Sequence, residues 1–194
     1  MAREEKKKLF SKQNMVSLFI VFIMVSSVIG YMWGKDTGES FKYKDYKFFR
    51  KGREWTLKAD GIELAFDNFP TDVESINVSS DIIDRLKGLI EIDTTCDEND
   101  SHTEVIAKAQ YSMWDVLSKT SNTYVRVGMI DENEFNLPVI TCDDASADIP
   151  VLYFKRSNMT EVETEDNCII IEAKNEIDVL RVKDRILYGL LGII

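Results

Sequence analysis

Hydrophobic and polar positions alternate along most of the chain, but one segment near the N-terminus is apolar throughout. Residues Met15–Trp33 contain no charged side chain and are rich in Val, Ile, Phe and Met. A helix of this length rises about 28 Å, which approaches the ~30 Å hydrocarbon core of a bilayer. Tyr31 and Trp33 end the segment, as aromatic residues do at a headgroup boundary. The pattern predicts a transmembrane helix.

Two other interpretations of this segment are possible. A buried core helix is disfavoured, because such a helix seldom runs this long without a polar face. A cleaved signal peptide is the stronger alternative, since a basic tail precedes the segment. However, the segment exceeds the usual apolar region of about 7–15 residues, and no A-x-A-like cleavage site follows it. We therefore expect an uncleaved signal anchor.

The residues that follow the anchor predict a connector and then a β-meander. Residues 34–44 are polar with two glycines, which favours a juxtamembrane connector. Two predicted strands flank a Lys51-Gly52 turn, and Asp60-Gly61 is typical of a type I′ turn before a third segment in which apolar and polar residues alternate. The three predicted strands are Tyr46–Phe49, Glu54–Ala59 and Ile62–Phe66.

The middle of the chain predicts a strand–helix–strand unit after one short helix. Ser80–Lys87 reads as the short helix, which Gly88 ends. Leu89–Thr94 and Tyr124–Ile130 alternate as strands. Between them, Ser101 and Glu104 form a predicted capping box for a helix that reaches about Lys119. This order favours a right-handed crossover between two parallel strands.

The last third predicts four short strands and a final helix from Asn175 to about Leu191. Ile177, Leu180, Leu187 and Leu191 mark one side of this helix, with Asp184 as an exception. The run Ile169–Ile171 suggests a strand covered on both faces. We expect the apolar end Ile193-Ile194 to pack into the core. The four predicted strands are Pro138–Cys142, Val151–Lys155, Glu161–Thr164 and Cys168–Glu172.

Together these elements predict an α/β or α+β fold with one mixed sheet. An N-terminal β-meander, a strand–helix–strand unit and a C-terminal helix make up the domain. The predicted organisation is a basic cytoplasmic tail over 1–14, the anchor over 15–33, the connector over 34–44 and an acidic domain over 45–194.

Charge is distributed unevenly along the chain. The net charge is −10, yet residues 1–58 carry 13 Lys or Arg against 6 Asp or Glu, and residues 59–194 carry 11 against 28. The acidic part repels nucleic-acid backbones, which disfavours a nucleic-acid partner. The basic part flanks the anchor, where it attracts lipid headgroups.

Orientation is predicted from several weak signals. Basic residues flank the anchor on both sides, but charges attached to a long translocated domain count for little, which favours a cytoplasmic N-terminus and an extracytoplasmic domain. Three N-glycosylation sequons, at Asn77, Asn99 and Asn158, favour the same orientation.

The three cysteines suggest a structural role more than a catalytic or redox one. Cys142 and Cys168 border predicted strands, so either a disulfide or two separate buried thiols fits them. Cys96 is left over. No C-x-x-C is present, which disfavours a redox-active pair or a zinc ribbon.

No motif identifies a catalytic site or a cofactor. The loop 96–102 gathers metal-ligand residue types, but solvation and helix capping explain them as well as a metal does. The acidic run 131–134 and the pair Asp143-Asp144 lack EF-hand spacing. No phosphate-binding glycine motif is present. We expect no metal and no cofactor, and an enzyme is the less favoured class.

One ligand-site hypothesis remains as an alternative. Open α/β sheets bind ligands at the carboxyl ends of their strands, here near residues 93–102 and 130–148. The residues that this hypothesis would bring together are Cys96, Asp97, His102, Asp143 and Asp144.

The segment Pro138–Ile194, which contains PVITC, NCIIIEA and DRILYGLLGI, resembles single-pass envelope proteins of archaea that have no assigned activity. The likeness covers about the last 57 residues. It implies a disulfide between Cys142 and Cys168 and an envelope location. The leading expectation is therefore a tethered interaction or accessory-subunit domain with a protein partner in the cell envelope.

Overall fold

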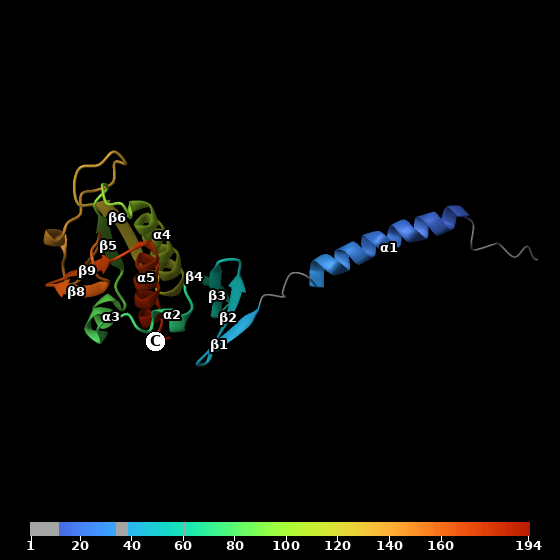
Figure 1. Cartoon of the computed structure of the whole chain (residues 1–194), viewed down its shortest axis with the longest axis horizontal. Helices are drawn as coiled ribbons and strands as arrows, with labels where there is room; N and C mark the ends of the chain where they lie inside the picture. Colours follow the sequence, from blue (N-terminus) through green and yellow to red (C-terminus); the bar gives the residue numbers. More distant parts are fainter. Residues whose placement is uncertain (1–11, 34–38, 60) are drawn as a thin grey trace, which may run out of the picture. The chain divides into compact units, whose positions relative to one another are not determined.

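The computed structural model describes residues 12–33, 39–59 and 61–194, with the side chains of residues 12–14 and 30–33 left out (Figure 1). Most of the predicted basic tail, part of the connector and Asp60 of the predicted turn lie outside the described residues. The chain forms two compact units, residues 1–39 and 40–194.

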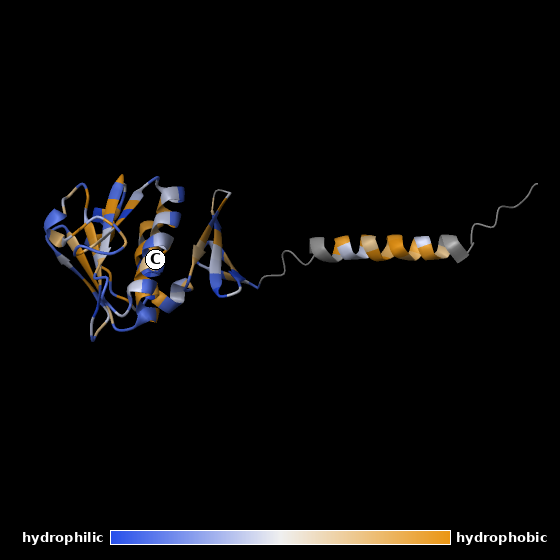
Figure 2. Cartoon of the chain, turned by 90° about the horizontal axis from the view of Figure 1, so that it is seen from above, coloured by the Kyte–Doolittle hydropathy of each residue, from blue (hydrophilic) through white to orange (hydrophobic). Residues whose placement is uncertain are grey.

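The first unit contains one helix, α1 (Lys12–Trp33). Its described side chains, residues 15–29, are all exposed, and most of them are apolar, as the colouring of the helix in Figure 2 shows. Over the part of the chain that the structure describes, no helix has both the length and the apolarity needed to cross a membrane. The predicted anchor ends at Trp33, beyond the described side chains.

The second unit is a mixed α/β domain with two sheets. Its elements are β1 (Ser40–Tyr43), β2 (Tyr46–Lys51), β3 (Glu54–Ala59), β4 (Ile62–Phe66), α2 (Pro70–Val73), α3 (Ser80–Leu86), β5 (Glu91–Cys96), α4 (Thr103–Thr120), β6 (Tyr124–Met129), the 3-10 turn η2 (Cys142–Asp144), β7 (Val151–Arg156), β8 (Glu161–Glu165), β9 (Cys168–Ala173) and α5 (Glu176–Leu190).

The first sheet is an antiparallel meander in the order β1-β2-β3-β4. It confirms the three predicted strands and adds β1, which the sequence assigned to the connector. Phe41 and Tyr43 of β1 hold it in place, because their rings lie 5.1 Å from the Trp55 ring and 6.2 Å from the Phe69 ring, respectively. Aromatic packing therefore orders a segment whose local composition is typical of a linker.

The second sheet has the order β6-β5-β7-β9-β8, with only β8 antiparallel. The predicted parallel pairing of β5 with β6 across α4 is confirmed. The prediction of one mixed sheet was wrong, because the meander forms a separate sheet. Its apolar face, which includes Phe48, Leu57 and Leu64, packs on helices and does not extend the parallel sheet.

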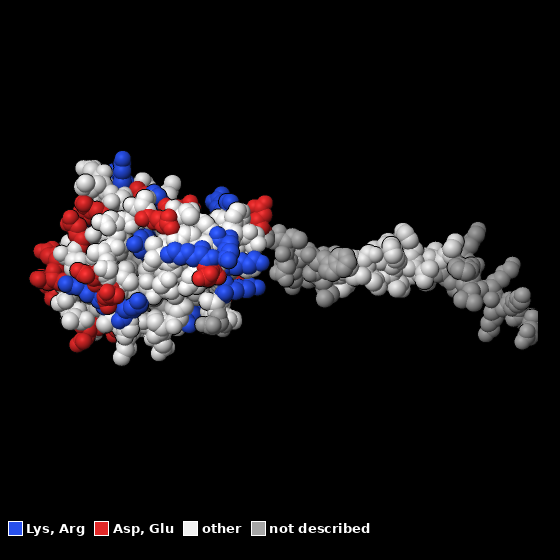
Figure 3. Space-filling model, turned by 90° about the horizontal axis from the view of Figure 1, so that it is seen from below, with Lys and Arg blue, Asp and Glu red and all other residues white. Residues whose placement is uncertain are grey.

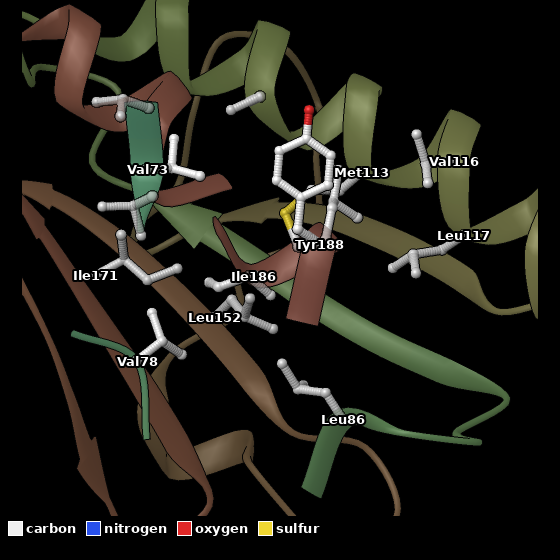
Figure 4. Packing of buried hydrophobic residues seen from close by; sticks show 14 of the residues in the cluster. Val73, Val78, Leu86, Met113, Val116, Leu117, Leu152, Ile171, Ile186 and Tyr188 are labelled. Atoms are coloured by element: carbon white, nitrogen blue, oxygen red, sulfur yellow. The ribbon is translucent and has the colours of Figure 1, made fainter. Parts of the chain in front are cut away.

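The helices α4 and α5 fill the space between the two sheets. Phe48 and Phe66 of the meander pack against Tyr188 of α5, with ring centroids 6.0 and 4.5 Å away. On the other side, apolar side chains of both helices meet those of the parallel sheet, such as Leu152 and Ile171 (Figure 4). The result is a three-layer β–α–β arrangement around one core.

The segment 130–150 covers the opposite face of the parallel sheet. Cys142 and Cys168 form a disulfide that fastens this segment to the start of β9. Beside it, Gly128 of β6 lets the segment approach, because a Cβ there would lie 2.6 Å from both Pro138 O and Ile140 Cδ1. The predicted strand Pro138–Cys142 was wrong, because only Val139 pairs with β6, through a single bridge to Met129.

Several helix boundaries test the sequence predictions. The capping box at Ser101 was wrong, because α4 begins at Thr103, whose hydroxyl bonds loop carbonyls such as Asp100 O. The predicted start of α5 at Asn175 is confirmed, where the Asn175 side chain caps the helix by accepting from Asp178 N–H, and Ile193 is buried as expected. Ile177, predicted on the buried side of α5, is exposed because it lies in the first turn, beyond the edge of the core.

Candidate interaction groove

The outer edge of β6 leaves backbone hydrogen-bonding groups unpaired. Tyr124 N–H donates to Ile90 O at 2.7 Å, so even-numbered residues of β6 face β5 and odd-numbered residues face outward. Met129 uses its outward groups with Pro138 and Ile140. Among the described residues, nothing bonds the outward backbone groups of Val125 and Val127. A strand edge of this kind is a template for another strand.

A groove of about 650 Å³ runs along this edge between β6 and α4, which lie side by side in Figure 1. Exposed aromatic side chains of both elements form its walls. The ring centroids of Tyr111 and Trp114 of α4 lie 5.6 Å apart. These two residues are 64% and 38% exposed, and Tyr124 of β6 is 55% exposed. Leu137 and Pro138 also line it. Amphipathic rings of this type are favoured at binding sites.

Gln110 of α4 lies in the groove with an unsatisfied amide. Its side chain is 1% exposed, yet its Nε2 has no hydrogen-bond partner within the described chain. A buried donor without an acceptor costs about 1–3 kcal/mol. An occupant of the groove that offers a carbonyl oxygen would remove this cost.

The two edges of the parallel sheet differ in how they are protected. The opposite edge strand, β8, has the sequence EVETE, and its three glutamates make the addition of a strand unfavourable. β6 carries one charge, Arg126, and Asp93 neutralises it through a bidentate pair at 2.7 and 2.5 Å. The β6 edge therefore lacks the charged side chains that would prevent the addition of a strand.

The sequence did not identify this groove. Gln110 was the available signal, because it lies on the helix face marked by Ile106, Met113 and Leu117, where a polar residue is unexpected. The free edge depends on the strand order, which periodicity does not determine.

The five residues of the ligand-site hypothesis fall into two groups. Cys96 ends β5 and is buried, and burial together with Asp100 and Asp97 raises its thiol pKa to about 11. Such a thiol is inert at neutral pH. Asp97 accepts a hydrogen bond from Asn99 N–H, and His102 is buried just before α4. These residues therefore lie in or beside the loop before α4.

The other two residues lie elsewhere. Asp143 and Asp144 are exposed in η2, which the disulfide attaches to the amino end of β9. Asp144 accepts hydrogen bonds from Thr141 N–H and Oγ1 at 2.8 and 3.0 Å. The two groups therefore lie at different ends and on different faces of the sheet. No cluster of three potential metal ligands occurs among the described residues.

The three sequon asparagines, Asn77, Asn99 and Asn158, are exposed. Each lies outside helices and strands, so each side-chain amide is accessible.

A buried ionic network joins the loop after β4 to α4 and α5. Lys183 Nζ lies 2.9 Å from Asp67 Oδ2, 3.1 Å from Ser112 Oγ and 2.6 Å from Asp184 Oδ1. Asp184 also accepts hydrogen bonds from Asn68 N and Nδ2 at 2.7 and 2.9 Å. Burial works against the lysine charge, but Asp184 and Asp67 raise the pKa of Lys183 overall.

The Lys183 ammonium group donates to Asp67 and Ser112 and forms an ion pair with Asp184, so it is held as a buried cation and not as an available base or nucleophile. The network explains why Asp184 interrupts the apolar side of α5. Its role is to fasten β4, α4 and α5 together.

No protein-family model matches the chain, and no curated protein or solved structure is significantly similar to it.

Proposed function

We propose that this chain is a membrane-anchored, extracytoplasmic interaction domain that binds an extended segment of a protein partner along the edge of β6. The observation that carries the proposal is the unpaired edge of β6. Unpaired backbone groups of Val125 and Val127 lie beside an aromatic groove that contains the unsatisfied amide of Gln110. Strand addition would use all three features at once.

Anchoring and orientation rest on separate observations. The uncharged run Met15–Trp33 is long enough for a signal anchor. The disulfide favours an oxidising compartment, and the exposed sequons are compatible with one. The resemblance of the C-terminal segment to archaeal envelope proteins supports the same location.

The groove defines the chemistry of the partner. An extended segment would pair with Val125 and Val127, and alternate side chains would enter the aromatic walls. One of its carbonyl oxygens would accept from Gln110 Nε2. Apolar and aromatic side chains at every second position suit the groove, because Arg126 is already neutralised by Asp93.

The proposal can be tested with peptides selected from a random ten-residue library on the full chain in lipid nanodiscs. Val127→Pro removes one outward donor, and Gln110→Leu removes the amide while keeping an apolar side chain of similar size. Each change should weaken selected peptides about tenfold, the equivalent of about 1.4 kcal/mol and roughly one hydrogen bond. Thr164→Pro on β8 is the matched control and should leave the affinity unchanged.

Two results would contradict the proposal. Peptides that bind wild type and Val127→Pro equally, or a library that yields no binder dependent on Val127, would exclude strand addition. Dimerisation of the chain that Val127→Pro abolishes would show that the occupant is a second copy and not a partner.

A further inference from the structure

The outer face of the meander carries three lysines in one row across three strands. Lys42 of β1 is the cross-strand partner of Lys47 of β2. The register that pairs Phe48 with Leu57 places Lys58 of β3 on the other side of Lys47. These three residues, the lysine row, are all exposed.

The lysine row is electrostatically unfavourable in the isolated protein. Like charges directly opposite on neighbouring strands destabilise a sheet by a few tenths of a kcal/mol or more. Within the described residues, no carboxylate forms an ion pair with Lys42, Lys47 or Lys58. Glu63 continues the row on β4 opposite Lys58, but it forms its ion pair with Lys51 and interacts only more weakly with Lys58. An anion shared by the three ammonium groups would remove the repulsion.

An aromatic side chain lies within the row. The Phe49 ring is half-buried, with Lys47 Nζ at 5.1 Å and Lys58 Nζ at 5.8 Å from its centroid. The ring is attracted to both ammonium groups and keeps them close together. Lysines around an aromatic ring form an amphipathic surface, which suits the boundary between headgroups and acyl chains.

The meander is also the basic part of an acidic protein. Residues 40–59 carry seven Lys or Arg against two Asp or Glu, although residues 59–194 are strongly acidic. Figure 3 shows basic side chains gathered at the end of the domain that the meander forms, and acidic side chains gathered at the other end. This polarity would orient the domain over a negatively charged surface.

We propose that the lysine row binds the phosphate headgroups of an anionic bilayer and holds the outer face of the meander against it. This inference rests on the proposed anchoring. Only residues 34–39 separate α1 from β1, a length that reaches about 20 Å at most. A bilayer that holds the anchor is therefore always within reach, and each lysine near an anionic surface contributes about 1 kcal/mol.

The test places a fluorescent reporter beside the row in the full chain. In Ser40→Cys, residue 40 is the cross-strand partner of Phe49, and the new thiol is the only reactive one, because Cys96 is buried and the other two cysteines are bonded. A polarity-sensitive dye at residue 40 should shift to the blue in vesicles with 30% phosphatidylglycerol, and not in phosphatidylcholine alone. A dye on Thr164→Cys should show no shift.

Charge variants identify the source of the shift. Lys42→Gln, Lys47→Gln and Lys58→Gln combined should abolish it, whereas Lys87→Gln, Lys119→Gln and Lys174→Gln combined, with the same net charge, should preserve it. Lys47→Gln alone should lower the ratio of bound to unbound domain about fivefold, which corresponds to ~1 kcal/mol. Salt at 0.5 M should reduce the shift, since it screens surface charge.

The outcomes separate this inference from the proposed function. A chain that does not float with phosphatidylcholine vesicles would refute the anchoring. If the chain floats but the dye emission does not change with phosphatidylglycerol, only the proposal that the lysine row binds lipid would be overturned. Reversal by 10 mM inorganic phosphate at constant ionic strength would overturn it in favour of a free-phosphate site. A fall in the melting temperature of the triple row variant would indicate a structural role instead.

Discussion

Lys183 and Asp184 are consecutive in α5 and are both completely buried. Taking two charges out of water is costly, and only good geometry with further hydrogen bonds offsets the cost. Asp67 and Asn68 of the loop after β4 and Ser112 of α4 provide these bonds. The network therefore specifies how the meander and the two helices meet.

Removing the lysine should destabilise the domain strongly. Lys183→Met leaves Asp184 charged and buried, so we expect a loss of about 3–5 kcal/mol in the free energy of unfolding. Lys183→Met with Asp184→Leu should lose less than the single change, because no buried charge is left uncompensated in α5. Lys174→Met, at an exposed lysine, serves as the control in urea unfolding. Equal losses in the single and double variants would contradict this account.

Asp67 makes the stability depend on pH. Burial raises the pKa of its carboxyl, but Lys183 and Lys108 outweigh this and hold it below the usual 3.8. A lowered carboxyl pKa stabilises the fold above about pH 4, and this stabilisation is lost as the pH falls through the folded-state pKa. Asp67→Asn should thus cost about 2–4 kcal/mol at pH 7 and much less near pH 2. A cost that does not change with pH would show that Asp67 acts without its charge.

At the scale of elements, the segment 130–150 depends on a covalent bond for its position. The disulfide closes a loop with a sequence separation of 26 between Cys142 and Cys168. Replacing both cysteines by serine should lower the free energy of unfolding by about 3 kcal/mol, since the unfolded chain gains freedom. Chemical denaturation of the two forms measures the difference. A loss below 1 kcal/mol would mean that contacts such as those of Ile140 hold the segment unaided.

Local patterns predicted most elements of this fold. Alternation located β4, β5 and β6, and the continuous apolar run Ile169–Ile171 located β9. Asn175 and Gly88 gave the start of α5 and the end of α3. Local patterns did not predict β1, because its order comes from the Trp55 and Phe69 rings. They also gave a strand at Pro138–Cys142, where the structure has only a single bridge between Val139 and Met129.

The candidate site was harder to predict than the elements. Gln110 is unusual only once Ile106 and Met113 are known to be buried around it. The edge position of β6 follows from the strand order, which long-range packing decides. The cysteine, histidine and carboxylates of the ligand-site hypothesis are neighbours in the sequence pattern, but the sheet separates them by face and by end.

At the scale of the whole molecule, a tethered domain has two surfaces with different partners. The lysine row suits a lipid surface, and the β6 groove suits an extended segment of a protein. The lysine row lies on the outer face of the meander, whereas the groove is formed by β6 of the parallel sheet and by α4. A domain held by the first surface would keep the second available.

Cysteine labelling tests the orientation of this domain. In intact cells, a membrane-impermeant maleimide should label Cys142 and Cys168 only after reduction, and Cys96 only after unfolding, because Cys96 is buried with a pKa near 11. Mass spectrometry assigns the modified residues. If Cys142 and Cys168 are labelled only after the cells are opened, the domain lies in the cytoplasm. The disulfide would then no longer support an extracytoplasmic location.

Amide hydrogen exchange of the full chain in nanodiscs, with and without a selected peptide, tests strand addition at β6 most directly. Protection of the Val125 and Val127 amides should rise at least tenfold on binding, because each gains a hydrogen bond to the added strand. The amides of Val162 and Thr164 on β8 should not change. A peptide that binds tightly while Val125 and Val127 exchange as fast as before would contradict the account.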